Sequence, residues 1–153
     1  MLQGKTIAVV IPAYNEEKQI GLVIETMPDF VDRIIVVNDF SIDRTSEIVE
    51  QFQGLSGERD IPFVKISIRN KYSVANETIE RLNQQELSFF TPSKVICKDP
   101  FNSRIILINQ LKNAGVGAAI ARGYKWAKDY NIDCTAVMAG DGQMDPDELE
   151  NIC

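Results

Sequence analysis

Histidine is absent from this sequence and cysteine is scarce, with three residues in 153. Without histidine, neither general-base catalysis by an imidazole nor a histidine metal ligand is available within these residues. Cys97, Cys134 and Cys153 are too few and too far apart to predict a disulfide framework or a zinc site. Any chemistry carried by these residues must therefore come from carboxylates, amides, hydroxyls and backbone groups.

Long apolar runs are also lacking. No stretch approaches the roughly 20 apolar residues that a transmembrane helix needs, and the first residues do not have the pattern of a signal peptide. The cytoplasm is therefore the expected location. The formal net charge of −6 lacks the basic excess that an extended nucleic-acid interface requires, so we expect no nucleic-acid partner.

The composition is that of an ordinary globular protein, with 44% hydrophobic and 25% charged residues. A length of 153 residues is sufficient for one domain with one hydrophobic core. We therefore expect a single domain over residues 1–153.

Short β-branched and apolar runs alternate with stretches of helical periodicity. Such runs are typical of strands buried on both faces of a sheet, and we predict strands at 6–11, with Pro12 ending the first, and at 33–37, 104–108 and 134–139. Helices are predicted between them: one capped by Asn15, one over 44–52 and one ending near Tyr130. This alternation predicts an α/β fold with a mainly parallel sheet flanked by helices.

Residues 55–102 interrupt the alternation and are interpreted as an insertion. A strand is predicted at 63–68, an amphipathic helix at 74–87 and an irregular tail at 89–102. The aromatic and basic residues of this segment, such as Phe89 and Lys94, allow two interpretations. The insertion either packs on the domain as an ordinary surface, or forms a lip that faces a membrane or a partner.

Polar side chains follow three of the predicted strands. The first strand runs into Pro12-Ala13-Tyr14-Asn15-Glu16, the second into Asn38-Asp39, and the last into Gly140-Asp141-Gly142-Gln143. Because the carboxyl ends of parallel strands meet at one edge of a sheet, these groups should line one cleft.

The chemistry of this cleft suits a nucleoside diphosphate. The ring of Tyr14 can lie against a nucleobase, and the carboxylate of Asp39 can accept a hydrogen bond from a base N–H. Side-chain oxygens of Asp141 and Gln143 can hold Mg²⁺ or Mn²⁺, which would neutralise a diphosphate. Taken alone, residues 140–143 also fit an ordinary turn, because Asp and Gly are common turn residues.

A glycine-rich segment at 113–123 leads into the third predicted helix. Gly115 and Gly117 let the backbone approach a ligand at the helix N-terminus, where phosphate oxygens bind readily. The alternative is that they only permit tight packing of helix on strand. The third glycine of a dinucleotide fingerprint and the Gly-Lys-Ser/Thr of a P-loop are both absent, so NAD binding and P-loop chemistry are disfavoured.

In combination, these motifs resemble the N-terminal half of the family 2 inverting glycosyltransferases, which have the GT-A fold. The motifs occur in the family's order, and within the family they are most similar to the polyprenyl-phosphate (dolichyl- or undecaprenyl-phosphate) sugar transferases. The resemblance implies a Rossmann-like nucleotide-sugar-binding domain. It lies in Ile11-Pro12-Ala13-Tyr14-Asn15-Glu16-Glu17, Ile34 to Asp39 with Ser41 and Asp43, Asn113-x-Gly-x-Gly-x-Ala, and Met138 to Pro146.

The resemblance also implies roles for individual residues. Asp39 matches the carboxylate that reads the base, and Asp141 matches the second acid of the family's Asp-x-Asp. Gln143 matches the metal-ligating glutamine of the polyprenyl-phosphate branch, so Mg²⁺ or Mn²⁺ would be held by Asp141 and Gln143. The implied donor-binding residues are Pro12, Ala13, Tyr14, Glu16, Val37, Asp39, Gly140 and Asp141.

The chain departs from the family pattern at several positions. Ala139 stands where the first acid of Asp-x-Asp is usual, Phe40 where a glycine is usual, and Asn38 where an aspartate is usual. The family's acceptor site and catalytic base follow the Asp-x-Asp region, so catalytic residues are expected beyond Cys153. The chain is accordingly interpreted as a GT-A domain truncated at its C-terminus.

The leading hypothesis is a glycosyltransferase that moves a sugar from a UDP- or GDP-sugar to a polyprenyl phosphate or a saccharide by metal-assisted inverting displacement. The missing C-terminal part would then associate with the cytoplasmic face of a membrane. The first alternative is a nucleotide-sugar-binding fragment or degenerate copy without turnover. A sugar nucleotidyltransferase is disfavoured, because it would need a glycine-rich loop with a basic residue after the first strand, where this chain has Pro-Ala-Tyr-Asn-Glu.

Overall fold

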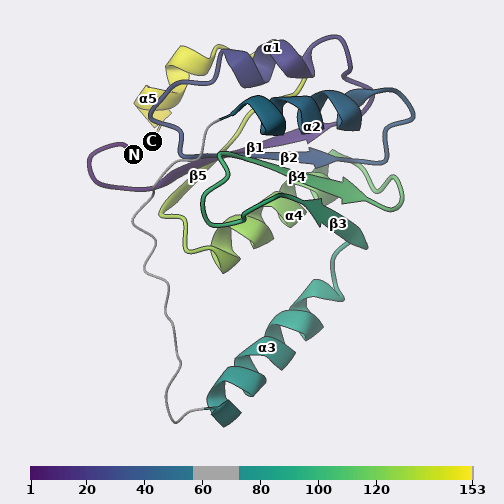
Figure 1. Ribbon diagram of the computed structural model, residues 1–153, viewed down its shortest axis with the longest axis vertical. Helices are drawn as coiled ribbons and strands as arrows, with labels where there is room; N and C mark the ends of the chain where they lie inside the picture. The colour runs from purple at the N-terminus through teal and green to yellow at the C-terminus, as the bar shows by residue number, and fades with distance from the viewer. Residues whose placement is uncertain (57–72, 153) are drawn as a thin grey trace.

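A five-stranded sheet with helices on both faces forms the centre of the fold (Figure 1). The computed structural model describes residues 1–56 and 73–152. Four strands run parallel, and β3 is an antiparallel edge strand. In the spatial order β3-β4-β2-β1-β5, the strands are β3 (Ser93–Ile96), β4 (Ile105–Gln110), β2 (Arg33–Asn38), β1 (Ile7–Ala13) and β5 (Cys134–Val137). The predicted α/β fold with a mainly parallel sheet is confirmed.

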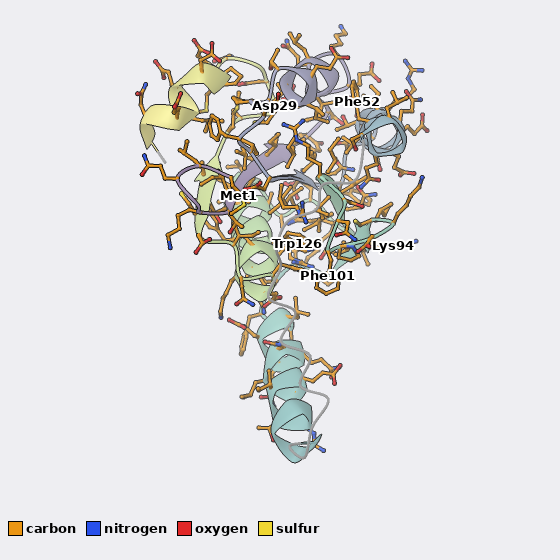
Figure 2. All side chains as sticks on the ribbon, turned by 60° about the vertical axis from the view of Figure 1, so that its left-hand side comes forward. Met1, Asp29, Phe52, Lys94, Phe101 and Trp126 are labelled. Carbon is orange, nitrogen blue, oxygen red and sulfur yellow. The ribbon has the colours of Figure 1, made fainter. Side chains whose placement is uncertain are left out.

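The helices form a layer on each side of the sheet. One face is covered by α1 (Ile20–Glu25) and α2 (Thr45–Leu55), with the short η1 (Pro146–Glu148) and α5 (Leu149–Ile152) beside them (Figure 1). The other face is covered by α4 (Val116–Asp129), while α3 (Ser73–Leu87) extends away from the sheet. Phe52 lies on the α2 side and Trp126 on the α4 side (Figure 2).

Both faces of the central strands are buried, which explains why these strands read as continuous apolar runs rather than alternating ones. Ile7, Val9 and Ile11 pack under α1 and α2, whereas Ala8 and Val10 pack under α4. On the α4 side, the ring of Trp126 stacks on Tyr130 with centroids 4.1 Å apart, and Phe101 meets Tyr130 edge-on.

The strand order reverses at β1. From β1 the chain proceeds to β2 and then to β4 on one side, whereas β5 adds to the other side of β1. The carboxyl ends of β1 and β5 therefore border the point at which open α/β sheets bind ligands.

The prediction that Pro12 ends the first strand is wrong. Pro12 lies inside β1 and pairs in register with Val37 of β2. Successive residues of a strand bond to opposite neighbours. Val10 accepts from Met138 on the β5 side and Ala13 accepts from Asp39 on the β2 side, so Pro12 faces β5. Pairing with β5 has already ended at Val10, and the missing N–H of Pro12 therefore leaves no gap in the ladder.

The predicted capping of the first helix by Asn15 is wrong. Residues 16–19 form turns, and α1 begins only at Ile20. Asn15 has a positive φ of 56°, a conformation that asparagine tolerates better than most residues, and its side chain bonds to a different loop.

The predicted insertion contributes an element to the sheet. The helix expected at 74–87 is confirmed as α3, but the tail expected to be irregular contains β3, which pairs with β4 along Ser93–Ile96. The strand predicted at 63–68 lies outside the described residues. In the remaining segments the boundaries differ slightly from those predicted: β4 extends to Gln110, β5 ends at Val137, and α2 extends to Leu55.

Candidate functional site

A cavity of about 330 Å³ opens at the carboxyl ends of β1 and β5. All of the predicted donor-binding residues except Val37 border it. Its walls come from the end of β1, the residue after β2, the first turns of α4 and the turn after β5. The bordering residues are Pro12, Ala13, Tyr14, Glu16, Asp39, Val116, Ala119, Ala139, Gly140 and Asp141.

Two predicted site residues do not border this cavity. Val37 is fully buried in the core beneath α4, because its side chain belongs to the face of β2 that this helix covers. Gln143 borders a neighbouring cavity between α1 and the turn at 142–146, and its backbone N–H donates to Asp141 Oδ1 at 3.1 Å. The two predicted metal ligands thus face different cavities. In the described part of the chain, no group of three or more Asp, Glu or Cys side chains could hold a metal ion.

Two loops at this edge of the sheet, residues 15–17 and 41–45, are joined by reciprocal hydrogen bonds and are called the paired loops below. Asn15 N donates to Ser41 Oγ at 2.9 Å, and its Oδ1 accepts from Ile42 N at 3.0 Å. The backbone N–H groups of residues 16 and 17 donate to Thr45 Oγ1 and Asp43 Oδ2, and Glu17 Oε2 accepts from Arg44 N. These bonds hold the backbone of Glu16 in place.

Asp43 is the central acceptor of the paired loops. Its carboxylate also accepts from the N–H and hydroxyl of Thr45, at the start of α2. Burial works to raise the pKa of Asp43, but these bonds and that from Glu17 outweigh it and hold the pKa below its ordinary value. The charged carboxylate therefore stabilises the fold above the unfolded-state pKa, and this contribution is lost as pH falls through the lower folded-state pKa.

Substitution Asp43→Asn is expected to destabilise the chain by about 1 kcal/mol at neutral pH, because an amide replaces a charged acceptor of three donors. The difference from the parent chain should narrow below about pH 4, where the parent carboxylate also becomes protonated. Urea unfolding of both proteins across this range measures the difference. A gap that is constant with pH would contradict this role of the charge.

Asp39 is buried at the end of β2 and holds the loop that precedes α4. Its Oδ1 accepts from Ala114 N at 2.8 Å and its Oδ2 from Gly115 N at 2.7 Å. Gly115 has a φ of +88°, which an L side chain rarely adopts. Each carboxylate oxygen has a second lone pair, so Asp39 can still accept from a ligand in the cavity.

Three residues that border the cavity were not among the predicted binding residues: Val116, Ala119 and Ala139. Val116 and Ala119 belong to the first turns of α4, which the glycines at 115 and 117 had already marked as a place for phosphate oxygens. The glycine pattern in the sequence thus indicated the N-terminus of this helix, but it did not identify Val116 and Ala119 individually.

Gly140 brings the turn after β5 close to β1. A Cβ atom at this position would lie 3.1 Å from the carbonyl oxygen of Pro12, closer than most real contacts of this kind. The absence of a side chain therefore sets the width of the crevice between the two strands.

The cavity is strongly acidic for a proposed diphosphate site. Its charged bordering residues are Glu16, Asp39 and Asp141, and no described lysine or arginine borders it. Burial raises the pKa of Glu16, and the charges of Asp141 and Asp43 raise it further. An anionic ligand would be repelled here unless a cation lay between it and the carboxylates, and hard divalent cations prefer such oxygen ligands.

This fold and cavity define a Rossmann-like α/β domain of the GT-A type, with its ligand crevice at the reversal of strand order. Residues 8–75 match the family described as Glycosyl transferase family 2. The predicted resemblance of the chain to this family is confirmed.

A curated relative extends the comparison over nearly the whole chain. It is the UDP-N-acetylglucosamine–dolichyl-phosphate N-acetylglucosaminyltransferase of Methanococcus voltae, which is 28% identical over 152 residues, or 99% of this chain and 47% of the relative. The chain thus spans about half the length of that relative. No helix among the described residues is both long and apolar enough to cross a membrane.

Proposed function

We propose that this chain is the donor-binding part of a glycosyltransferase that transfers a sugar from a nucleoside-diphosphate sugar to a polyprenyl phosphate. The observation that carries the proposal is the single cavity bordered by Tyr14, Asp39 and Asp141. It combines an aromatic ring, a carboxylate that can read a base, and a carboxylate that can hold a cation. The matches to family 2 and to a dolichyl-phosphate sugar transferase support the same assignment.

In this proposal the base and the diphosphate contact different residues that border the cavity. Tyr14, whose side chain is half exposed, stacks on the base, while Asp39 accepts from a base N–H. The diphosphate lies toward Asp141, in the turn after β5. The name of the relative points to UDP-N-acetylglucosamine as the first donor to test.

Mg²⁺ or Mn²⁺ would be held by Asp141 beside the diphosphate. When bound, such an ion supplies Lewis-acid stabilisation of the leaving diphosphate. We expect tight nucleotide binding to require the ion, because no described basic side chain borders the cavity to neutralise the diphosphate in its place.

Calorimetric titration of the chain with UDP, GDP and their sugars, with and without Mn²⁺, tests the proposal. We expect UDP to bind far more tightly with Mn²⁺ than without it, and Asp39→Ala to weaken this binding by about tenfold or more through loss of the base contact and of the loop anchor. Failure of all four ligands to bind would refute the donor site. Tight donor binding by a full-length protein that forms no glycolipid would favour the alternative of a binding module without turnover.

A further inference from the structure

The turn after β5 presents one acid to the cavity. Ala139 and Asp141 both border the cavity, and Ala139 has no oxygen with which to hold an ion. Among the described residues, Asp141 accepts one hydrogen bond, from Gln143 N to its Oδ1. A divalent ion held by this carboxylate alone would be weakly bound, since Mg²⁺ and Mn²⁺ sites usually combine several oxygen ligands.

Glu16 borders the same cavity from the β1 side. Its backbone is fixed, because its N–H donates to Thr45 Oγ1 at 2.9 Å and its carbonyl accepts from the N–H groups of Gln19 and Ile20. Its carboxylate, by contrast, has no hydrogen-bond or ion-pair partner among the described residues, unlike that of its neighbour Glu17. Glu16 is thus a partly buried carboxylate on a rigid backbone with unused oxygens.

The third acid of the cavity is already committed. Both oxygens of Asp39 accept short hydrogen bonds from Ala114 and Gly115, and in the proposed function its remaining lone pairs accept from the base. The pair that remains is Glu16 with Asp141, one on each side of the crevice between β1 and β5.

We infer that Glu16 is the second carboxylate ligand of the divalent cation, taking from β1 the place that Ala139 leaves empty in the turn after β5. The inference rests on the proposed donor function of this cavity. The ion would bind between Glu16, which follows β1, and Asp141, which follows β5, rather than between two acids of one turn.

A Mn²⁺ titration tests this inference without any turnover. Binding is measured as the loss of the electron paramagnetic resonance signal of the free ion. We expect Glu16→Gln to weaken Mn²⁺ binding by at least about tenfold, because even an outer partner of a metal ligand is commonly worth that much. The matched control is Glu25→Gln, which removes the same charge from an exposed position of α1 outside the cavity and should leave Mn²⁺ binding unchanged. Melting curves of all variants report whether the fold is intact.

A gain of function completes the experiment. In the Glu16→Gln background, Ala139→Asp should restore most of the Mn²⁺ affinity, because it returns a carboxylate to the same cavity from the other strand. A role for Glu16 in folding alone would show as a lower melting temperature with no such rescue.

Separate titrations with UDP distinguish this inference from the proposed function. Without metal, Glu16→Gln should bind UDP at least as well as the parent, because it removes a charge that repels the diphosphate. Unchanged Mn²⁺ affinity in Glu16→Gln, or an equal loss of UDP binding with and without Mn²⁺, would overturn the inference and leave the nucleotide site standing. If the parent chain binds no UDP under either condition, the proposed function itself fails.

Discussion

Replacement of Asp141 by alanine is expected to weaken Mn²⁺-dependent UDP binding by roughly 100-fold, which corresponds to about 2.7 kcal/mol. Asp141 is the acid that the turn after β5 contributes to the cavity, and it lies where the proposed diphosphate meets the ion. In the proposed site its loss removes a ligand of the ion and leaves the diphosphate near the remaining carboxylates of the cavity, Glu16 and Asp39. Both effects act in the same direction, which is why this substitution should have the largest effect on binding.

Calorimetry with and without Mn²⁺ measures the loss, and Asp145→Asn is the matched control. Asp145 belongs to the same turn, but its carboxylate accepts from Asp147 N at 3.0 Å and borders the neighbouring cavity. It should therefore leave UDP binding unchanged. Equal affinities of the parent and Asp141→Ala would show that the ion, or the diphosphate, is held elsewhere.

The largest expected effect on stability comes from Gly123→Ala in α4. A Cβ atom at this position would overlap the side chain of Val10, with Cγ2 at 2.8 Å and Cγ1 closer still. Val10 is fully buried on the central strand β1 and is β-branched, so neither its backbone nor its χ1 angle can move freely. The helix must therefore shift away from the sheet. We expect this shift to lower the free energy of unfolding by about 2–3 kcal/mol, near the upper end of the range for overpacked cores.

Urea unfolding measures this cost, and Gly117→Ala serves as the control in the same helix. A Cβ atom at Gly117 would meet no atom within 4 Å, and the position lies in the first turn of α4. Alanine there should be neutral or should stabilise the chain by up to about 1 kcal/mol, because it favours the helix over glycine. Similar destabilisation by both substitutions would point to a general intolerance of α4 rather than to contact with Val10.

The parallel sheet could be predicted because its strands are buried on both faces. Runs such as those around Val9, Val36 and Leu107 are too apolar and too β-branched to be anything but central strands. Once those strands were placed, the rule that their carboxyl ends share an edge was sufficient to bring Tyr14, Asp39 and most other predicted donor residues to one cavity.

The details that failed depend on contacts between segments distant in the sequence. Pro12 is tolerated within β1 only because its N side faces β5 beyond the end of their pairing. Asn15 has the composition of a helix cap, but it bonds instead to the loop after β2, some 27 residues away. β3 is a short, half-exposed edge strand, so no apolar run marked it in the sequence.

The site prediction was limited by side-chain direction. Val37 is one residue before Asn38 and two before Asp39, yet it lies in the core beneath α4 and not in the cavity. Gln143 is two residues after Asp141, yet its side chain borders another cavity. Spacing in a sequence locates a turn, but the path of the turn decides which of its side chains share a cavity.

The paired loops have a consequence for how this domain can change over evolutionary time. Because hydrogen bonds run in both directions between residues 15–17 and 41–45, a substitution in one loop removes a partner from the other. Effects of changes in the two loops will therefore not add, since residues of one hydrogen-bond network are energetically coupled. We therefore expect the two segments to vary together, so that a change of Asn15 or Glu17 requires a compensating change of Ser41, Asp43 or Arg44.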